Sequence, residues 1–501
     1  MDMALLNNKN SIKHMAKYLY GASVQGIQSF IFKTNKLSEI VGASELVEQI
    51  CNNAFFEKIG KDSNDSNIIL AAAGNIKYVF DQREDCEKCV LEFPKKIMEM
   101  APGITISQAV VEVVNPSDLG EEIQTLEQRL RVQRNIVDSP TEIGFMGLER
   151  SRRTGGVSVE HRGDDYIDSA TAAKIKNKDH LSLFKKLSGM NDLKTTHLAL
   201  DIENITSSGQ NSWIAVIHAD GNGLGNIIQN KGSELTQNRE FHAFSKAIEA
   251  ATTGAAKTAF ERVIPKIDTV SHYPIRPVLI GGDDLTVIIR ADLALDFTRE
   301  FIKEFELKSK EEFKNLKTTG LEEGLSCCAG IAFVKQSYPL HYAMHLSEDL
   351  CKDAKKMVKA NLGDNELPKS ALSFYKVQDS FVKDLKSLKE STLTTAEGRN
   401  FYYGPYTLEA LNKLDEKLDY LKEYASGKNA GKSTGKLRQV VSELYKDEST
   451  GSFMLERIKH IDKKFFNALE LEDELKITNG HKSQLLDLIT LHGFNYGNKQ
   501  N

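Results

Sequence analysis

Apolar positions along the chain alternate between strand-like runs and helix-like stripes, and the order of these segments points to a known unit. Four strand-type runs lie between residues 213 and 334, at 213–219, 276–280, 285–290 and 325–334. Segments with helical spacing of apolar residues accompany them at 238–263, 293–307 and 342–359. Gly281-Gly-Asp-Asp284 joins the two middle runs and is typical of a tight hairpin. The order β-α-β-β-α-β predicts a ferredoxin-like, or palm, unit.

The first part of the chain carries a weaker copy of the same pattern. Aligned without gaps, the segment around Ser23 matches the segment around Asp220, and further on, in a separate match, the segment 68–76 matches 277–285. Ala72-Ala-Gly-Asn75 then stands where the second copy has Gly-Gly-Asp-Asp. Two matches in the same order at similar spacing predict a duplicated palm, with a chance match of short apolar strands as the alternative.

These patterns predict an α+β protein with two ferredoxin-like palm domains and a helical C-terminal domain. We expect the following boundaries: 1–130 for a degenerate palm, 131–205 for a polar insertion with loops, 206–385 for the palm with Gly-Gly-Asp-Asp, and 386–501 for the helices. In the last region, leucines 408, 411, 414, 418 and 421 form one stripe, which we interpret as core packing.

Composition narrows the class of protein without selecting a function. The chain has 501 residues, of which 40% are hydrophobic and 27% charged, so a wholly disordered protein is excluded. The net charge of −5 excludes a generally basic, nucleic-acid-coating protein, although it leaves a local basic channel open. Six cysteines in no regular framework favour a reduced, cytoplasmic protein. We expect no membrane segment, because no apolar run approaches the ~18 residues that a span needs.

Three aspartates of the second palm are the candidate chemical centre. Asp283 and Asp284 lie on the hairpin, and Asp220 ends the neighbouring first strand. Two carboxylates ~4 Å apart repel by ~4 kcal/mol at an effective dielectric constant near 20, so such a cluster needs protons or a cation. An all-oxygen set favours Mg²⁺ or Mn²⁺ over zinc. The alternative is an ordinary hairpin with solvated carboxylates.

Glycines beside these aspartates predict a nucleotide-binding surface. Gly281 and Gly282 have no side chains, so a nucleotide can approach their backbone closely. The turn after Asp220 supplies four further candidate nucleotide-binding residues: Gly221, Asn222, Gly223 and Gly225.

Together the motifs resemble the polymerase/cyclase large subunit of type III CRISPR effector complexes. The resemblance rests on Gly281-Gly-Asp-Asp284, on the strand end at 220–225, and on segments 26–32, 36–46, 328–331, 338–339 and 354–356. It implies two palms that face each other with ATP between them, and catalysis by the second palm only. Asp220, Asp283 and Asp284 would bind the metal, Lys355 would contact the triphosphate, and Ser44 would contact nucleotide from the first palm.

The same resemblance implies a reaction and partners. A 3′-hydroxyl would attack an α-phosphate of ATP, giving cyclic oligoadenylates and pyrophosphate as messengers in antiviral defence. Other subunits of a CRISPR effector complex and guide or target RNA would be the partners.

Several residues depart from that family's pattern. The chain has no His-Asp dipeptide, so we expect no DNA cleavage by an HD nuclease domain. The region 131–205 has no cysteine and Cys86-Glu-Lys-Cys89 is a lone pair, so we predict no zinc. Asn222 stands where a second acidic residue is common, which leaves the metal coordination open. His218 with Asp220 is too isolated a pair to indicate a metal site of its own.

Two other functions stay open at this point. One is a non-catalytic scaffold subunit that binds RNA or proteins of a CRISPR effector complex. The other is a cyclic dinucleotide synthase, including a diguanylate-type enzyme that uses GTP, although Gly-Gly-Asp-Asp and the paired palms disfavour it. Nucleotide preference, ring size, the activating signal, homo-oligomer formation and dependence on partners are not determined by the sequence.

Overall fold

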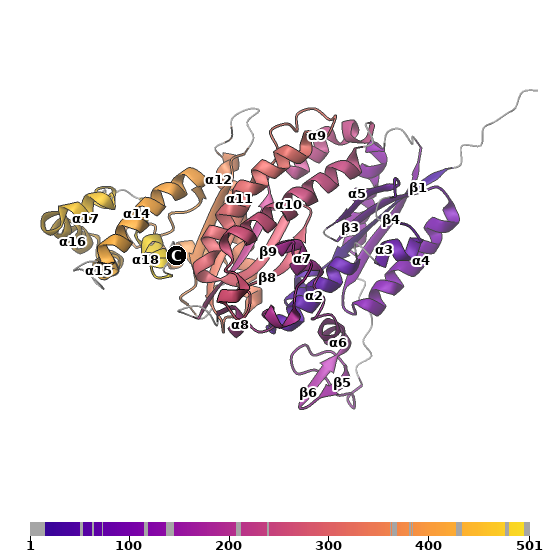
Figure 1. The fold of residues 1–501 in the computed structure, drawn as a ribbon, viewed down its shortest axis with the longest axis horizontal. Coiled ribbons are helices and arrows are strands. Elements are labelled where there is room, and N and C mark those ends of the chain that lie inside the picture. Colours follow the sequence, from indigo (N-terminus) through magenta and orange to yellow (C-terminus); the bar gives the residue numbers. More distant parts are fainter. Residues whose placement is uncertain are drawn as a thin grey trace, which may run out of the picture.

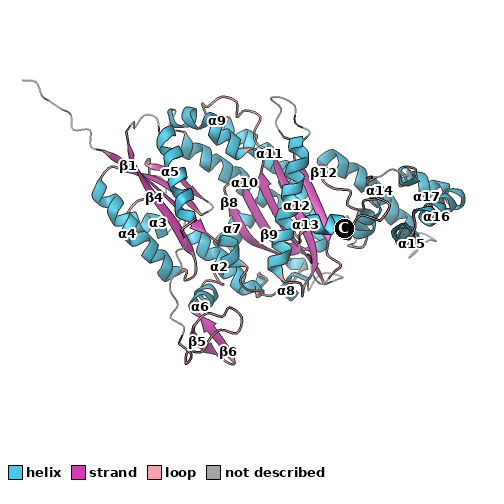
Figure 2. Ribbon diagram, turned by 180° about the vertical axis from the view of Figure 1, so that it is seen from behind, coloured by secondary structure: helices cyan, strands magenta, loops and turns pink. Residues whose placement is uncertain are grey.

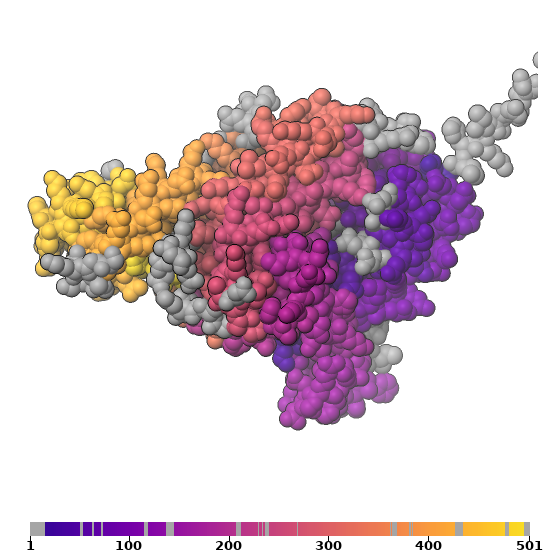
Figure 3. All heavy atoms as spheres, in the orientation of Figure 1, coloured from indigo at the N-terminus to yellow at the C-terminus, as the bar shows by residue number. Residues whose placement is uncertain are grey.

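A computed structural model describes residues 16–50, 54–62, 65–72, 74–114, 119–136, 145–206, 212–237, 240–360, 362, 368–379, 382, 384–426, 433–475 and 480–494. The first palm lies at one end of the molecule, the second palm in the middle, and the C-terminal helices at the other end (Figure 1). In the space-filling view these helices form a projection (Figure 3). Within the described ranges, no helix is both long and apolar enough to cross a lipid bilayer.

The first palm is a four-stranded antiparallel sheet in the order β2-β3-β1-β4. Its elements are β1 (Lys17–Gln25), α1 (Ile27–Ile31), α2 (Leu37–Gln49), α3 (Phe55–Ile59), β2 (Ile68–Ala72), β3 (Asn75–Phe80), α4 (Arg83–Met100) and β4 (Thr105–Val113). Leu19, Ile76 and Phe93 are almost completely buried, and they join two strands and a helix in one core. The predicted β-α-β-β-α-β unit is confirmed here.

The second palm repeats this strand order and extends it. Its sheet has the order β12-β11-β10-β7-β9-β8, in which the last four strands correspond to β4-β1-β3-β2 of the first palm. Its elements are β7 (Trp213–Gly221), α9 (Leu224–Gln237), α10 (Phe241–Val263), η3 (Ile267–Thr269), β8 (Ile275–Gly281), β9 (Asp284–Arg290), α11 (Ala291–Phe313), β10 (Cys327–Lys335), α12 (Leu340–Ala360), β11 (Ala371–Lys376) and β12 (Tyr406–Thr407). Sequence analysis did not predict β11 and β12. β11 runs parallel to β10, because α12 crosses over between them.

The polar region between the palms contains regular structure as well as loops. Its elements are α5 (Gly120–Arg134), β5 (Ser158–Arg162), β6 (Asp165–Asp168), α6 (Ser169–Lys176), α7 (Ser182–Ser188), η2 (Thr195–His197) and α8 (Ile202–Thr206). β5 and β6 form a hairpin that projects from the molecule (Figure 1). The Asp168 carboxylate caps α6 by accepting a hydrogen bond from the Thr171 amide at 2.7 Å. α5 packs on the first palm and runs across the predicted boundary at 130/131.

The C-terminal helices are α13 (Leu385–Ser391), α14 (Leu408–Ser426), α15 (Ser433–Lys446), α16 (Glu448–Ile461), α17 (Lys463–Ala468), η4 (Asp473–Leu475) and α18 (Leu485–His492). The leucine stripe lies on α14, where residues 411, 414, 418 and 421 are at most 1% exposed. The stripe therefore packs in a core, as the sequence predicts.

A lysine between the palms ties them together close to the Gly-Gly-Asp-Asp hairpin. α7 and α2 lie between the two sheets (Figure 2). Lys186 of α7 makes ion pairs with Glu48 of α2 at 2.7 Å and with Glu249 of α10 at 2.6 Å. Its ammonium group also donates to the carbonyl of Ile280, one residue before the hairpin motif, at 3.4 Å. The hairpin is thereby anchored at the junction of the two palms.

Candidate functional site

The Gly-Gly-Asp-Asp segment forms the turn between β8 and β9. Gly281 pairs with Asp284 across the hairpin, so Gly282 and Asp283 make a two-residue turn. Gly282 has a φ of 58°, in the left-handed region where most side chains are strained. The glycine at this position is therefore a requirement of the turn.

Strand β7 brings Asp220 next to that turn. β7 and β9 are paired up to Ala219 and Leu285. The adjoining Asp220, near the end of β7, and Asp284, at the start of β9, therefore lie next to each other at the same end of these two strands. A Cβ atom on Gly221 would lie 2.8 Å from the Cβ and the Oδ2 of Asp283. The close approach of the two strand ends thus needs glycine here. We call Asp220, Asp283 and Asp284 the carboxylate cluster.

Lys355 of α12 supplies a positive charge to the carboxylate cluster. Its ammonium group makes an ion pair with Asp220 and donates to the Gly221 carbonyl oxygen at 2.8 Å. Burial alone would lower the pKa of this amine, but Asp220 outweighs that effect, and the pKa of Lys355 is raised. Lys355 therefore carries its charge at neutral pH and faces the aspartates rather than solvent.

One lysine does not neutralise three carboxylates. Burial, followed by the neighbouring Asp220 carboxylate, raises the pKa of Asp283 to about 7. Burial raises the pKa of Asp284 well above its usual range, and the charges of Asp220 and Asp283 add to that rise. The cluster therefore holds protons that a cation would displace. A donor set of this kind fits a divalent metal ion.

A histidine joins the carboxylates, which the sequence interpretation did not anticipate. His218 lies two residues before Asp220 on β7, so both side chains project from the same face of the strand. Among the described residues, ligand atoms of His218, Asp220 and Asp284 all lie within 4.8 Å of one another. Burial lowers the pKa of His218 to about 4, so its imidazole is neutral and can act as a ligand. In the sequence, the one sign of this arrangement is that His218 and Asp220 lie two residues apart on a predicted strand.

The turn after Asp220 has one buried residue and an open part. Asn222 is 3% exposed, and its amide group donates to the Ser326 hydroxyl at 3.0 Å, while its backbone N–H donates to the Ser326 carbonyl at 2.8 Å. Asn222 thus fastens the turn to the segment before β10. A Cβ atom on Gly223 or Gly225 would meet no other atom within 4 Å, so this part of the turn is open to a ligand.

The region that holds these residues matches one protein-family model. Residues 213–362 match the model described as Cas10/Cmr2, second palm domain. The match contains β7, the Gly-Gly-Asp-Asp hairpin and α12. In this region the chain is Cas10-like, and it is similar to the second palm domain of that family. No curated protein sequence matches the chain.

Solved structures show the same fold for almost the whole Cas10-like chain. A Csm1-Csm4 cassette in complex with one ATP matches with a TM-score of 0.57 and 12% identity, over 96% of this chain and 70% of that chain. A Csm1-Csm4 cassette in complex with cA3 gives the same values. A third, in complex with cA4, has a TM-score of 0.55 and 12% identity over 95% and 70% of the two chains. At this identity the likeness establishes the fold.

The first palm of the Cas10-like chain has neutral residues at the corresponding positions. Ser23 pairs with Asn75 across β1 and β3. These two positions are equivalent to those of Asp220 and Asp284 in the second palm. The Ser23 hydroxyl donates to Asn75 Oδ1 at 2.8 Å, and the Arg134 guanidinium donates to Ser23 Oγ at 3.1 Å. Of the residues aligned with Gly-Gly-Asp-Asp, Ala73 lies outside the described part of the chain. The described positions offer no carboxylate to a metal ion.

Two other sequence predictions concern residues away from the carboxylate cluster. Ser44 is 2% exposed within α2 and donates to the Ile40 carbonyl at 2.9 Å, so it does not join the cluster, and its contact with nucleotide stays a prediction. Cys86 and Cys89 are buried in α4, where burial raises the pKa of Cys86 to about 11 and of Cys89 to about 12. Their thiols are therefore protonated, and the absence of zinc stays a prediction.

Proposed function

We propose that this Cas10-like protein is a metal-dependent nucleotidyltransferase that converts ATP into cyclic oligoadenylates. A 3′-hydroxyl of one nucleotide attacks the α-phosphate of another, and pyrophosphate leaves. The observation that carries the proposal is the carboxylate cluster with Lys355, built on the Gly-Gly-Asp-Asp hairpin of the second palm. The similar Csm1-Csm4 structures, which are complexes with ATP, cA3 and cA4, support ATP and its cyclic products as the nucleotide class.

Each residue of the site has a distinct role in this proposal. Asp220, Asp283 and Asp284 hold Mg²⁺ or Mn²⁺, which, when bound, activates the attacking hydroxyl and neutralises charge on the phosphates. Lys355 fixes Asp220 and adds a positive charge beside the triphosphate. Gly281 and Gly282 let the nucleotide approach the backbone, and the open turn at Gly223 and Gly225 gives it room.

The likeness to Csm1-Csm4 cassettes also supports a partner class. A structure of the Csm1-Csm4 subcomplex in the type III-A CRISPR-Csm interference complex matches 95% of this chain at 13% identity, with a TM-score of 0.53. We infer that the protein works with subunits of an RNA-guided effector complex. Guide and target RNA belong to the same proposal.

Product analysis tests the proposed function directly. The purified protein is incubated with each of the four ribonucleoside triphosphates and Mg²⁺ or Mn²⁺, and the products are resolved by mass spectrometry. We expect cyclic oligoadenylates from ATP. Cyclic dinucleotides from GTP would instead identify a diguanylate-type enzyme. Failure to bind or convert any nucleotide, with effector subunits and target RNA also present, would leave the non-catalytic scaffold.

His218 adds a prediction about the choice of metal ion. Because imidazole is a better ligand for Mn²⁺ than for Mg²⁺, His218→Asn should weaken Mn²⁺ binding by about tenfold and Mg²⁺ binding much less. Mn²⁺ binding is measured by electron paramagnetic resonance, and Mg²⁺ is measured by competition. His180→Asn, at an exposed position, is the control. Equal losses for both ions would show that His218 supports the site without contacting the metal.

A further inference from the structure

A pocket lies at the end of the second palm sheet opposite to the carboxylate cluster. Strand register places three of its residues together, because Trp213 pairs with Lys335, and Lys376 pairs with Phe333 two residues earlier on β10. Asp220 lies seven residues along β7 from Trp213, a separation of ~23 Å at ~3.3 Å per residue. The two sites therefore occupy opposite ends of one strand.

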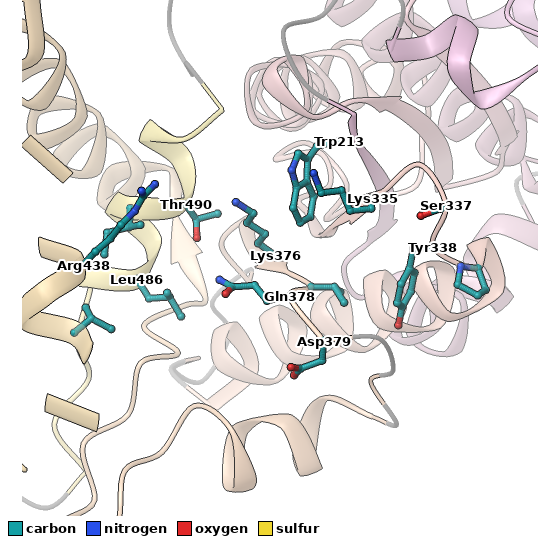
Figure 4. Close-up of a pocket in the computed structure, with 14 residues that line it drawn as sticks. Trp213, Lys335, Ser337, Tyr338, Lys376, Gln378, Asp379, Arg438, Leu486 and Thr490 are labelled. Atoms are coloured by element: carbon teal, nitrogen blue, oxygen red, sulfur yellow. The ribbon is translucent and has the colours of Figure 1, made fainter. Parts of the chain in front are cut away.

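The C-terminal helices close the other side of this pocket. Figure 4 shows Arg438 of α15 and Leu486 and Thr490 of α18 across from Trp213 and Lys376. The volume is about 820 Å³, within the range of ~300 to 1,000 Å³ typical of small-molecule sites. We call it the Trp213 pocket. Its walls come from the palm sheet on one side and from the helical domain on the other.

The charge of the Trp213 pocket is positive. Lys335, Lys376 and Arg438 line it, and none of them makes an ion pair with another described residue. The two lysine ammonium groups each lie 4.5 Å from the centre of the Trp213 ring, and that of Lys335 also donates to the Ser212 hydroxyl at 3.4 Å. Asp379 is the one carboxylate among the described lining residues, and it lies apart from the three cations in Figure 4.

The crowding of these cations favours the binding of an anion. Burial lowers the pKa of Lys376, and the charges of Arg438 and Lys335 lower it further. The backbone of Lys376 is paired within the sheet, but its ammonium group makes no hydrogen bond to another residue in the described part of the chain. An anion with several oxygen atoms would relieve this repulsion and accept the free donors. The apolar part of the lining, which includes Val441 and Leu486, suits a planar group attached to that anion.

We propose that the Trp213 pocket binds a nucleotide. Its phosphate oxygens contact Lys335, Lys376 and Arg438, and its base packs against the apolar side of the pocket. The source is either a free nucleotide or one nucleotide unit of an oligonucleotide, since both present the same chemistry. Binding here requires no catalysis at the carboxylate cluster.

The chain offers a reporter placed in this pocket. Trp213 is the sole tryptophan, so a change of intrinsic fluorescence reports the Trp213 pocket and not the distant cluster. The full-length protein, kept in EDTA, is titrated with a non-hydrolysable ATP analogue, with a short 5′-phosphorylated oligoadenylate, and with inorganic tripolyphosphate. We expect saturable changes with the analogue or the oligoadenylate, and the tighter of the two identifies the source. No saturable change with either would overturn the proposal.

Charge-removing variants test the contacts. Lys376→Gln with Arg438→Gln should weaken the affinity by at least about tenfold, because two phosphate contacts are lost. Lys386→Gln with Arg457→Gln, both at exposed positions, is the matched control and should change nothing. Thermal unfolding checks the fold, and Lys335→Gln, at an exposed position, replaces the double variant if that fails to fold. Unchanged affinity in the pocket variants, or tripolyphosphate binding as tightly as the nucleotides, would show the assignment to be wrong.

Discussion

Replacing Asp283 and Asp284 together by asparagine is expected to reduce nucleotide conversion by at least about a thousandfold. The amides keep the volume of the side chains but remove two of the three negative charges that hold the cation. Metal catalysis of phosphoryl transfer supplies several kcal/mol, and each ~1.4 kcal/mol is a factor of ten in rate. The measurement is the rate of pyrophosphate release, together with mass spectrometry of the nucleotide products.

The chain contains a matched control for this double variant. The hairpin between β5 and β6 contains the same Gly-Asp-Asp sequence, at Gly163, Asp164 and Asp165, and both of these aspartates are exposed. Asp164→Asn with Asp165→Asn makes the same pair of substitutions away from the carboxylate cluster and should leave the rate unchanged. The variant at Asp283 and Asp284 should also unfold at a temperature no lower than the parent, because it removes partly buried carboxyl groups whose charges repel each other. Turnover that persists in pure double-variant protein would contradict the site assignment.

Lys355→Gln should reduce the rate by about a hundredfold, the second-largest effect. Glutamine cannot supply the charge that pairs with Asp220, so the carboxylate cluster loses its one described cation. Removal of a single charged group at a transition state that carries negative charge costs ~10²- to 10³-fold. The values of kcat and KM for ATP are the measurement, and kcat should carry most of the loss.

Neighbouring substitutions separate the role of this charge from a general effect on α12. Lys356→Gln changes the next residue, which is exposed, and should have no effect. Lys355→Arg keeps the positive charge and should recover part of the activity. If glutamine and arginine are equally damaging, the shape of the lysine and not its charge would be what the site needs.

Much of the candidate site could be predicted because it is local in the sequence. The Gly-Gly-Asp-Asp sequence predicts the two-residue turn at Gly282 and Asp283, and the apolar run before Asp220 predicts where β7 ends. Alignment of the two palms also predicted neutral residues in the first copy, and Ser23 and Asn75 indeed face each other across β1 and β3.

Other parts of the site depend on contacts between distant segments. His218 appeared isolated, because its partner Asp284 lies 66 positions away, and only the pairing of β7 with β9 brings them together. Asn222 carried no sequence signal for its hydrogen bond to Ser326, which lies before β10. The hydroxyl of Ser44 donates to the Ile40 carbonyl within α2, and its contact with nucleotide stays a prediction.

The sequence by itself determined the two palm units, the order of their strands and helices along the chain, and the carboxylates at one hairpin, because alternation of apolar residues and turn chemistry act over a few residues. The tertiary structure alone decided that Lys355 neutralises Asp220, that β11 and β12 widen the second sheet, and that cations of three segments meet around Trp213. These features depend on how helices and strands pack across long separations, and short-range patterns carry no information about such packing.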